Sequence, residues 1–315
     1  MRERLLYPDI CKFVAIFIVT CSHCAQYISG ETWTNFFLGT HLDIAFNMPL
    51  FMLISGWFIN LDKMRETKAL VFFWSKFQRL MIPAFVWYVL MFLLARPQTS
   101  PLSFYWYLTA LFVCMCIIYV FAKVFKNNVL CMSLSTLFVL ACPITDFVHI
   151  NFMFPYLWGG VILNKIYNSK YDKWFFWTCL IIGVVLSFYW KTDYTVYRTP
   201  LDVLHINIQM IVIYLYRFII GLTLSSAIIY LIKSSESILV PLAKYGQYSL
   251  PVYTGSFVIN SAVAILLVHL NYHTNQMLLI DIVSISLCCV IYFIIVIFSN
   301  LSRRNTVTKL LFLGE

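Results

Sequence analysis

The chain has 315 residues, of which 62% are hydrophobic, 18% are aromatic and only 11% are charged, and its formal net charge is +9. Soluble globular proteins carry about 25% charged residues, so this composition excludes an ordinary soluble domain and indicates a polytopic membrane protein. The basic excess fits a positive-inside bias, with membrane lipids as partners, and we expect no nucleic-acid partner. With 10 Gly and 10 Pro there is no linker, which predicts a single domain over 1–315.

Apolar windows predict an all-α membrane helix bundle of about ten transmembrane helices. The expected spans are 8–28, 43–60, 77–95, 104–122, 129–142, 150–166, 174–190, 208–232, 249–270 and 278–299. The window 129–142 is short for a hydrocarbon core about 30 Å thick, so nine or eleven spans stay open. The first window is long enough to span and contains polar side chains, so we interpret it as a retained helix rather than a cleaved signal.

The distribution of Lys and Arg predicts the orientation. If the N-terminus lies inside, 17 of the 22 basic residues fall within cytoplasmic connections. The outer side holds only Arg96, Lys191 and Arg198, and Lys12 and Arg217 lie within spans. Cytoplasmic loops of membrane proteins carry this excess of basic residues. The sequence therefore predicts that both termini face the cytoplasm.

The first expected helix carries three ionisable side chains, Asp9, Lys12 and His23. Eleven helical steps return to within about 20° of the start, so Lys12 and His23 share a face about 16 Å apart, and Asp9 joins that face one turn below Lys12. Each such residue costs at least about 2.5 kcal/mol inside a bilayer, which favours a functional role. The structural alternative is an Asp9–Lys12 ion pair with a His that bonds a neighbouring helix.

Two later segments also carry information. In the second expected helix Pro49 disturbs the backbone ladder, and the small pair Ser55-Gly56 lets another helix approach closely. At the start of the third, Lys76 and Arg79 share a helical face. These two cations either anchor the helix at the membrane surface or bind the phosphates of an anionic cofactor.

Cysteine usage points to free thiols rather than to disulfides or a metal site. The ten cysteines fall in or at the ends of apolar windows, away from the expected outer loops. The fragment Cys21-Ser22-His23-Cys24 offers only three ligands, with no second ligand pair elsewhere, so we predict no bound metal.

Five motifs in order resemble one known family. They are Asp9-x2-Lys12-x10-His23, Met48-Pro49-Leu50-Phe51 with Ser55-Gly56, Lys76-x2-Arg79 with Pro83, Trp106-Tyr107-Leu108, and Gly246-x2-Ser249-Leu250-x2-Tyr253. From residue 4 to about 300 the chain resembles the integral-membrane acyltransferase 3 family, in particular its fucose 4-O-acetylase-like branch. Two positions depart from the family pattern, because Asn47 and Ser256 stand where a His is common. An Asn side chain can hydrogen-bond but does not titrate near neutral pH.

The resemblance implies a membrane-bound O-acetyltransferase of a bacterial cytoplasmic (inner) membrane. It would transfer an acyl group, usually acetyl, from acetyl-CoA to a hydroxyl of a cell-envelope polysaccharide or lipid-linked sugar, alone or with a periplasmic or cell-surface partner protein. In this interpretation His23 removes the proton of the acceptor hydroxyl. Lys12, oriented by Asp9, and the pair Lys76 and Arg79 would meet the CoA.

Five further residues are candidates for acceptor binding: Asn47, His41, Asp43, Trp106 and Arg217. His41 and Asp43 lie at the expected outer mouth of the second helix, where they line an acceptor path or belong to an exposed loop. Trp106 equally fits an interfacial aromatic belt. Arg217, in the middle of an apolar window, pairs with a carboxylate or contacts a substrate.

Two other functions are consistent with intramembrane charges. A proton-coupled transporter or flippase of lipid-linked sugars would use the charges as a proton relay and would need no CoA. A glycan polymerase would normally have a large outer loop, whereas the longest expected here, 191–207, is short. The polymerase is therefore the weakest of the three functions.

Overall fold

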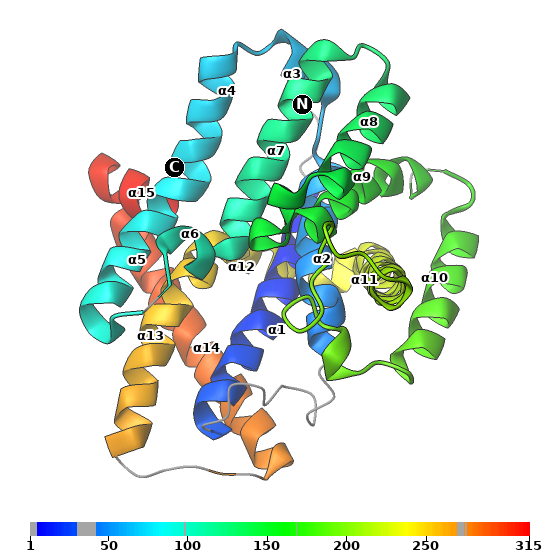
Figure 1. The fold of residues 1–315 in the computed structure, drawn as a ribbon. Coiled ribbons are helices and arrows are strands. Elements are labelled where there is room, and N and C mark those ends of the chain that lie inside the picture. Colours follow the sequence, from blue (N-terminus) through cyan, green and yellow to red (C-terminus); the bar gives the residue numbers. More distant parts are fainter. Residues whose placement is uncertain (1–4, 30–41, 98, 168, 270–273, 275) are drawn as a thin grey trace. The chain divides into compact units, whose positions relative to one another are not determined.

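The computed structural model describes residues 5–29, 42–97, 99–167, 169–269, 274 and 276–315 (Figure 1). The described chain is 84% helical and contains no strand, which confirms the predicted all-α class. Apolar stretches in lipid form helices because every backbone N–H and C=O must find a partner within the segment.

A helix lies at each of the ten predicted spans. They are α1 (Tyr7–Ser29), α2 (Leu42–Trp57), α4 (Ala69–Lys76) running through η1 (Phe77–Met81) into α5 (Ile82–Ala95), α7 (Trp106–Val124), α8 (Asn128–Ala141), α9 (Ile150–Ile166), α10 (Asp172–Ser187), α11 (Ile208–Ser234), α13 (Ser249–His269) and α14 (Met277–Ser302). Within the described residues, six segments are long and apolar enough to cross a membrane: α1, α4–α5, α7, α11, α13 and α14. The count of ten spans and the orientation of the termini stay predictions.

Several short elements were not predicted. They are α3 (Leu61–Glu66), α6 (Pro101–Phe104), α12 (Glu236–Gly246), α15 (Thr306–Leu313) and two 3₁₀ segments, η2 (Pro143–His149) and η3 (Thr192–Tyr194). Of these, α12 bears most on the candidate site. It has Glu236 in its first turn and Lys244 in its last, the arrangement that the helix dipole favours.

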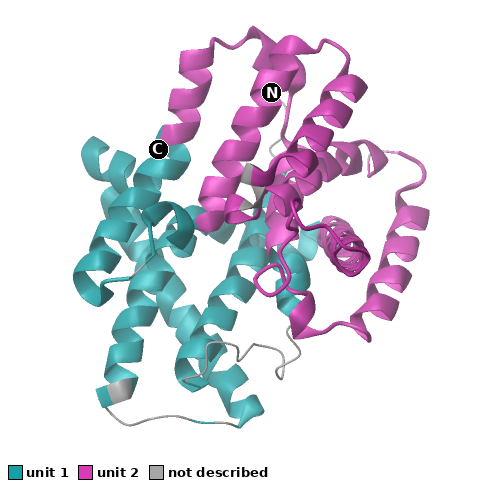
Figure 2. Ribbon diagram, in the orientation of Figure 1, with its two compact units in different colours: residues 1–47, 78–105, 235–315 teal, residues 48–77, 106–234 magenta. Residues whose placement is uncertain are grey.

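The chain divides into two compact units that alternate along the sequence (Figure 2). The first unit comprises residues 1–47, 78–105 and 235–315, and the second comprises residues 48–77 and 106–234. The chain passes from one unit to the other within α2 and within η1. The single domain over 1–315 stays a prediction.

In the first unit, α1 packs against α12, α13 and α14, and α5 packs against α13 and α15. Ile10 and Ile16 of α1 are fully buried. The ring of Phe13 lies 5.8 Å from that of Tyr245 and 5.3 Å from that of Tyr292, so it joins α1 to α12 and α14. The helix that carries the predicted catalytic stripe is therefore held on several sides.

In the second unit, α7 packs against α3, α8 and α9, while α11 packs against α9 and α10. A Cβ atom added at Gly56 would lie 2.0 Å from the carbonyl oxygen of Leu157, and one at Gly160 would lie 2.1 Å from that of Leu53. The pair Ser55-Gly56 therefore permits the close helix approach expected from the sequence, and α9 is the partner helix.

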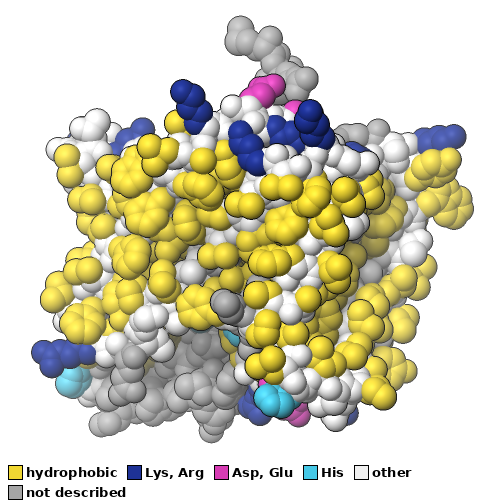
Figure 3. Space-filling view, turned by 45° about the horizontal axis from the view of Figure 1, so that its top comes forward, with side chains coloured by type: hydrophobic (Ala, Val, Ile, Leu, Met, Phe, Trp, Pro, Cys, Tyr) yellow, Lys and Arg dark blue, Asp and Glu magenta, His cyan; other side chains and the backbone are white. Residues whose placement is uncertain are grey.

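The surface supports a membrane location. Hydrophobic side chains cover most of the visible described face in Figure 3. Leu70 and Phe188 are each 81% exposed, and many other large apolar side chains are also exposed. An apolar surface of this extent is unfavourable in water and favourable against lipid tails.

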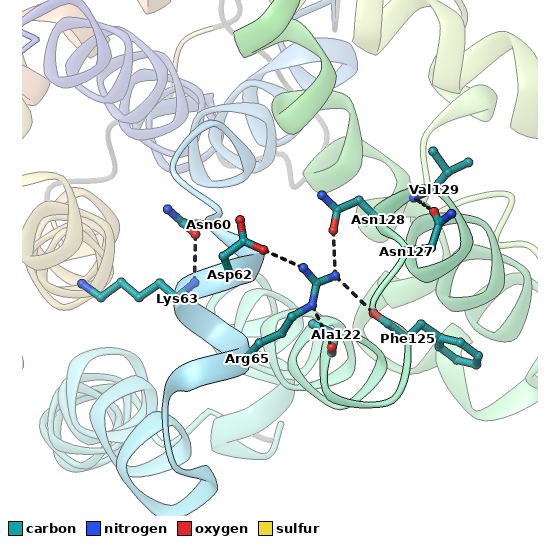
Figure 4. Close-up of polar contacts among 9 residues, drawn as sticks. All are labelled: Asn60, Asp62, Lys63, Arg65, Ala122, Phe125, Asn127, Asn128 and Val129. Carbon is teal, nitrogen blue, oxygen red and sulfur yellow. Dashed lines mark hydrogen bonds and ion pairs between the residues drawn. The ribbon is translucent and has the colours of Figure 1, made fainter.

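An arginine fixes α3 to the end of α7 (Figure 4). Arg65 Nε donates to the carbonyl oxygen of Ala122 at 3.2 Å, and its Nη2 donates to that of Phe125 at 3.1 Å. The same guanidinium bonds the side chains of Asn128 and Asp62, each at 2.7 Å. The last carbonyls of a helix lack partners within it, so Arg65 satisfies groups that α7 leaves open.

Candidate active site

The start of α1 is held by both ends of α12. Oε1 of Glu236 accepts hydrogen bonds from the backbone N–H groups of Leu6 (3.0 Å) and Tyr7 (3.2 Å). A carboxylate at this position satisfies free N–H groups and favours the helix dipole. At the other end of α12, a Cβ atom on Gly246 would lie 1.8 Å from the carbonyl oxygen of Asp9. The glycine of the late motif is thus needed where α12 meets Asp9.

Asp9 and Lys12 form the ion pair that the sequence suggested. Lys12 Nζ lies 3.0 Å from Asp9 Oδ1, and the side chains are 30% and 10% exposed, respectively. Asp9 is held by the packing of α12, so it can fix the direction of the lysine side chain. The remaining exposure of Lys12 leaves room for an incoming anionic group.

The imidazole of His23 is half-buried between its own helix and α13. Nδ1 lies 3.3 Å from Oε1 of Gln26, and the ring centroid lies 4.8 Å from that of Phe257. When Nδ1–H donates to the Gln26 oxygen, the lone pair of the neutral ring is on Nε2. In that tautomer, His23 can accept a proton at Nε2.

The two sequence neighbours of His23, Ser22 and Cys24, are both buried, and each bonds a side chain of another helix. Ser22 Oγ lies 2.9 Å from the carbonyl oxygen of Ile18 and also hydrogen-bonds Asp43, which is 0% exposed. Asp43 thus lies buried against α1, not in an exposed loop. The thiol of Cys24 donates to Oδ1 of Asn260 on α13 at 3.3 Å.

The positions that depart from the family pattern are also buried. Asn47 is 6% exposed and Ser256 is 2% exposed. Ser256 Oγ lies 3.4 Å from the carbonyl oxygen of Tyr253, a bond within its own helix. His41, another predicted acceptor residue, lies outside the described residues.

Of the basic pair at the start of the third predicted span, Lys76 precedes an irregular helical turn and Arg79 lies within it. Phe77–Met81 forms a π-helix, a feature that often marks functional sites and that the sequence did not reveal. Lys76 is half-buried with its Nζ 5.7 Å from the centroid of the Phe72 ring, and Arg79 is exposed. Lys76 belongs to the second unit and Arg79 to the first, so their joint binding of phosphates stays a proposal.

The comparison with known proteins decides the family. A family model described as an acyltransferase domain, that of the acyltransferase 3 family, matches residues 5–299. This chain belongs to that family. The match covers all five motifs, and it makes the protein a membrane acyltransferase in general terms. No curated protein and no solved structure matches the chain.

In the second unit of this acyltransferase, Trp106 lies in a cluster of rings. The centroid of its indole is 5.3 Å from that of His149 and 5.9 Å from that of Tyr197, and the last two are 5.4 Å apart. Burial and the nearby Arg217 guanidinium lower the pKa of His149 to about 4. The acyltransferase therefore holds this imidazole neutral at physiological pH.

Arg217 anchors the segment that supplies Tyr197. It is 2% exposed, and its Nη1 donates to the carbonyl oxygen of Thr199 at 2.9 Å. Its guanidinium carbon also lies 4.5 Å from the centroid of the Phe152 ring. These contacts give Arg217 a structural role in holding the 191–207 segment.

Sequence reasoning brought Trp106 and Arg217 forward separately but missed His149. The only available signal was a lone His just before an apolar window. Its backbone is unusual, because Val148 (φ 49°) and His149 (φ 57°) are both left-handed. A β-branched residue with positive φ is a strained conformation, and such strain gathers at functional sites.

Proposed function

We propose that this acyltransferase transfers an acetyl group from acetyl-CoA to a hydroxyl of a cell-envelope polysaccharide or lipid-linked sugar, in a bacterial cytoplasmic membrane. The observation that supports it is the half-buried His23, whose Nδ1 lies 3.3 Å from Oε1 of Gln26. A histidine on a membrane helix whose ring is held by a neighbouring side chain suits deprotonation of a hydroxyl. The resemblance to the fucose 4-O-acetylase-like branch supports the choice of acetyl and of a sugar acceptor.

In the proposed reaction His23 acts first as base and then as acid. It removes the acceptor proton while the hydroxyl oxygen attacks the thioester carbonyl carbon. It then returns that proton to the thiolate that leaves. General acid–base catalysis of this kind contributes about 10²- to 10⁴-fold.

Three cations are proposed to bind the phosphates or the pantetheine arm of the donor. Lys12 is aligned by Asp9 yet remains partly exposed. Arg79 is exposed, and Lys76 is half-buried at the end of α4. Arg can form bidentate bonds to a phosphate, while Lys acts as a point charge, so each of these cations can neutralise phosphate oxygens.

The acceptor is proposed to contact Trp106 of the second unit. Its ring cluster with His149 and Tyr197 offers apolar faces together with polar edges. Arg217 contributes indirectly, because it holds the 191–207 segment in place. Asn47 stays a proposed acceptor residue, whereas the burial of Asp43 suits a positioning role better.

The test is acetyl transfer by the full chain, purified in detergent with native lipids. Radiolabelled acetyl-CoA and an envelope glycan fraction are supplied to the wild type, to His23→Ala and to His205→Ala, whose imidazole is exposed in a loop. We expect transfer by the wild type and by His205→Ala, and a loss of about 10²-fold or more in His23→Ala. If the wild type ignores acetyl-CoA but moves lipid-linked sugar under a proton gradient, the flippase alternative is correct.

A further inference from the structure

An asparagine amide lies beside His23 on the neighbouring helix. Phe257 of α13 contacts the His23 ring, and Asn260 follows Phe257 by three residues, so both side chains lie on the same face of α13. On α1, Cys24 comes directly after His23, and its thiol bonds the Asn260 oxygen at 3.3 Å. Asn260 is therefore bonded to the residue that follows His23, and it lies on the face of α13 that contacts the His23 ring.

The thiol contact fixes which way the amide faces. Because the Cys24 S–H donates to Oδ1, the two N–H bonds of Nδ2, which lie in the amide plane, are directed away from the Cys24 thiol. Asn260 is 0% exposed, and Nδ2 has no hydrogen-bond partner in the part of the chain that the structure describes. A buried donor without a partner lowers the stability of the fold, so it calls for an explanation.

A second buried asparagine shows the usual arrangement. Asn151 of α9 is 1% exposed, and its Nδ2 donates to the carbonyl oxygen of Leu201 at 3.2 Å. Such bonds tie together parts of a membrane protein. Asn260 joins two helices only through its Oδ1 atom, which accepts from Cys24. The N–H groups of its Nδ2 atom remain available to another group.

We propose that Nδ2 of Asn260 donates a hydrogen bond to the carbonyl oxygen of the transferred acyl group. This inference rests on the acyl transfer proposed above. As the acceptor oxygen bonds to the thioester carbon and His23 Nε2 takes its proton, the carbonyl π electrons move to the oxygen that Asn260 holds. Collapse re-forms the C=O bond and breaks the C–S bond, and His23 protonates the leaving thiolate. The products are an ester and a free thiol.

A hydrogen-bond donor placed where negative charge develops stabilises the transition state more than the bound substrate. Removal of one such donor lowers kcat by about 10²- to 10³-fold in enzymes that use an oxyanion hole. The affinity for the donor substrate depends on other groups, here the proposed cations. Loss of the amide should therefore change kcat far more than KM.

The experiment replaces Asn260 with leucine, which has a similar shape and no polar atoms, in the purified full-length protein. We expect Asn260→Leu to lower kcat about 10²- to 10³-fold, with KM for acetyl-CoA within about twofold of wild type. We also expect its unfolding temperature in detergent to equal or exceed that of wild type, because a donor without a partner is removed. Asn151→Leu is the matched control, and it should unfold at a lower temperature because its amide is in use.

Three results would overturn the inference. The first is an Asn260→Leu protein that unfolds below wild type by as much as Asn151→Leu, since that would show a structural partner for Nδ2. The second is a folded Asn260→Leu protein that transfers acetyl at the wild-type rate, which removes this inference alone and leaves the proposed function intact. The third is a wild type with no acyl transfer at all, which removes both.

Discussion

Asp43 and Ser22 share a hydrogen bond that joins the first turn of α2 to α1, one residue before His23. Ser22 Oγ lies within hydrogen-bond distance of a second acceptor, the carbonyl oxygen of Ile18. A serine hydroxyl has a single proton, so it can donate to only one of the two. In the bond to Asp43, the hydroxyl donates to Oδ2 of the carboxyl, so this bond links α1 to α2. Asp43 is completely buried, so the bond supplies a donor that replaces water there.

The bond from Ser22 predicts a difference between two substitutions. Asp43→Asn should retain near-wild-type stability and transfer, because its side-chain oxygen can accept from Ser22 as the carboxyl does. Asp43→Ala should lose about 1–3 kcal/mol of unfolding free energy, because it leaves the Ser22 hydroxyl without that partner. Unfolding in detergent and acyl transfer check both variants. An Asn variant as impaired as the Ala variant would mean that the charge of the carboxylate, rather than an oxygen acceptor, is required.

The hydrogen bond between Gln26 and His23 predicts a role for Gln26 in orienting the base. Gln26→Ala frees both ring nitrogens, so part of the population has the wrong tautomer, and we expect acetyl transfer to fall about tenfold. Gln26→Glu retains an acceptor oxygen and should restore most of the activity. Steady-state kinetics of both variants measure the effect, and His23→Ala gives the residual rate without the imidazole. Full activity of Gln26→Ala would contradict the tautomer assignment.

The close contact of Gly246 with Asp9 predicts a strong backbone effect. Gly246→Ala puts a Cβ atom against a main-chain carbonyl that cannot move freely, so we expect a loss of about 3 kcal/mol in unfolding free energy and a parallel loss of transfer. Gly183→Ala is the matched control, because its Cβ would meet the flexible Leu224 side chain at 2.7 Å. Thermal unfolding of the two variants should differ clearly. Equal tolerance would mean that α12 can shift away from α1.

These cases show which parts of the site follow from sequence. The Asp9–Lys12 pair lies three residues apart on one helix, so helical periodicity alone predicted it. The contact of Gly246 with Asp9 joins residues far apart in the chain, and no local pattern contains it. Family resemblance brought both segments forward without giving the physical reason for the glycine.

The sequence was less informative where the backbone is irregular. The π-helix over Phe77–Met81 and the left-handed pair Val148 and His149 depend on surrounding packing rather than on local propensity. Asp43 lies in the first turn of α2, at its expected place near the start of that helix, but hydropathy does not reveal that packing buries its side chain. Asn260 lies within an apolar window of the sequence, which gives no sign of a function. The structure indicates one through its Nδ2 atom, which has no hydrogen-bond partner among the described residues.

The Arg65 contacts predict a local loss of stability in the second unit. Arg65→Ala removes donors from the carbonyl oxygens of Ala122 and Phe125, so we expect a loss of about 2 kcal/mol. Lys63→Ala is the control, because that side chain is exposed and its backbone N–H, capped by Asn60, is retained. Thermal unfolding in detergent should separate the two variants. A smaller effect of Arg65→Ala than of Lys63→Ala would show that α7 does not depend on this cap.

The low pKa of His149 predicts acid sensitivity of the ring cluster. The folded protein binds the His149 proton near pH 4 and the unfolded chain near pH 6.5, so between these values the unfolded state holds more protons. Stability from this group is complete above about pH 6.5 and is lost as the pH falls toward 4, by an amount on the order of 2 to 3 kcal/mol. His149→Phe keeps an aromatic ring against Trp106 and Tyr197 and cannot titrate, so its unfolding temperature should fall less than that of wild type on acidification. Because every other titrating group is common to both proteins, the difference between the two curves isolates His149. Parallel curves would show that its imidazole titrates alike in the folded and unfolded states.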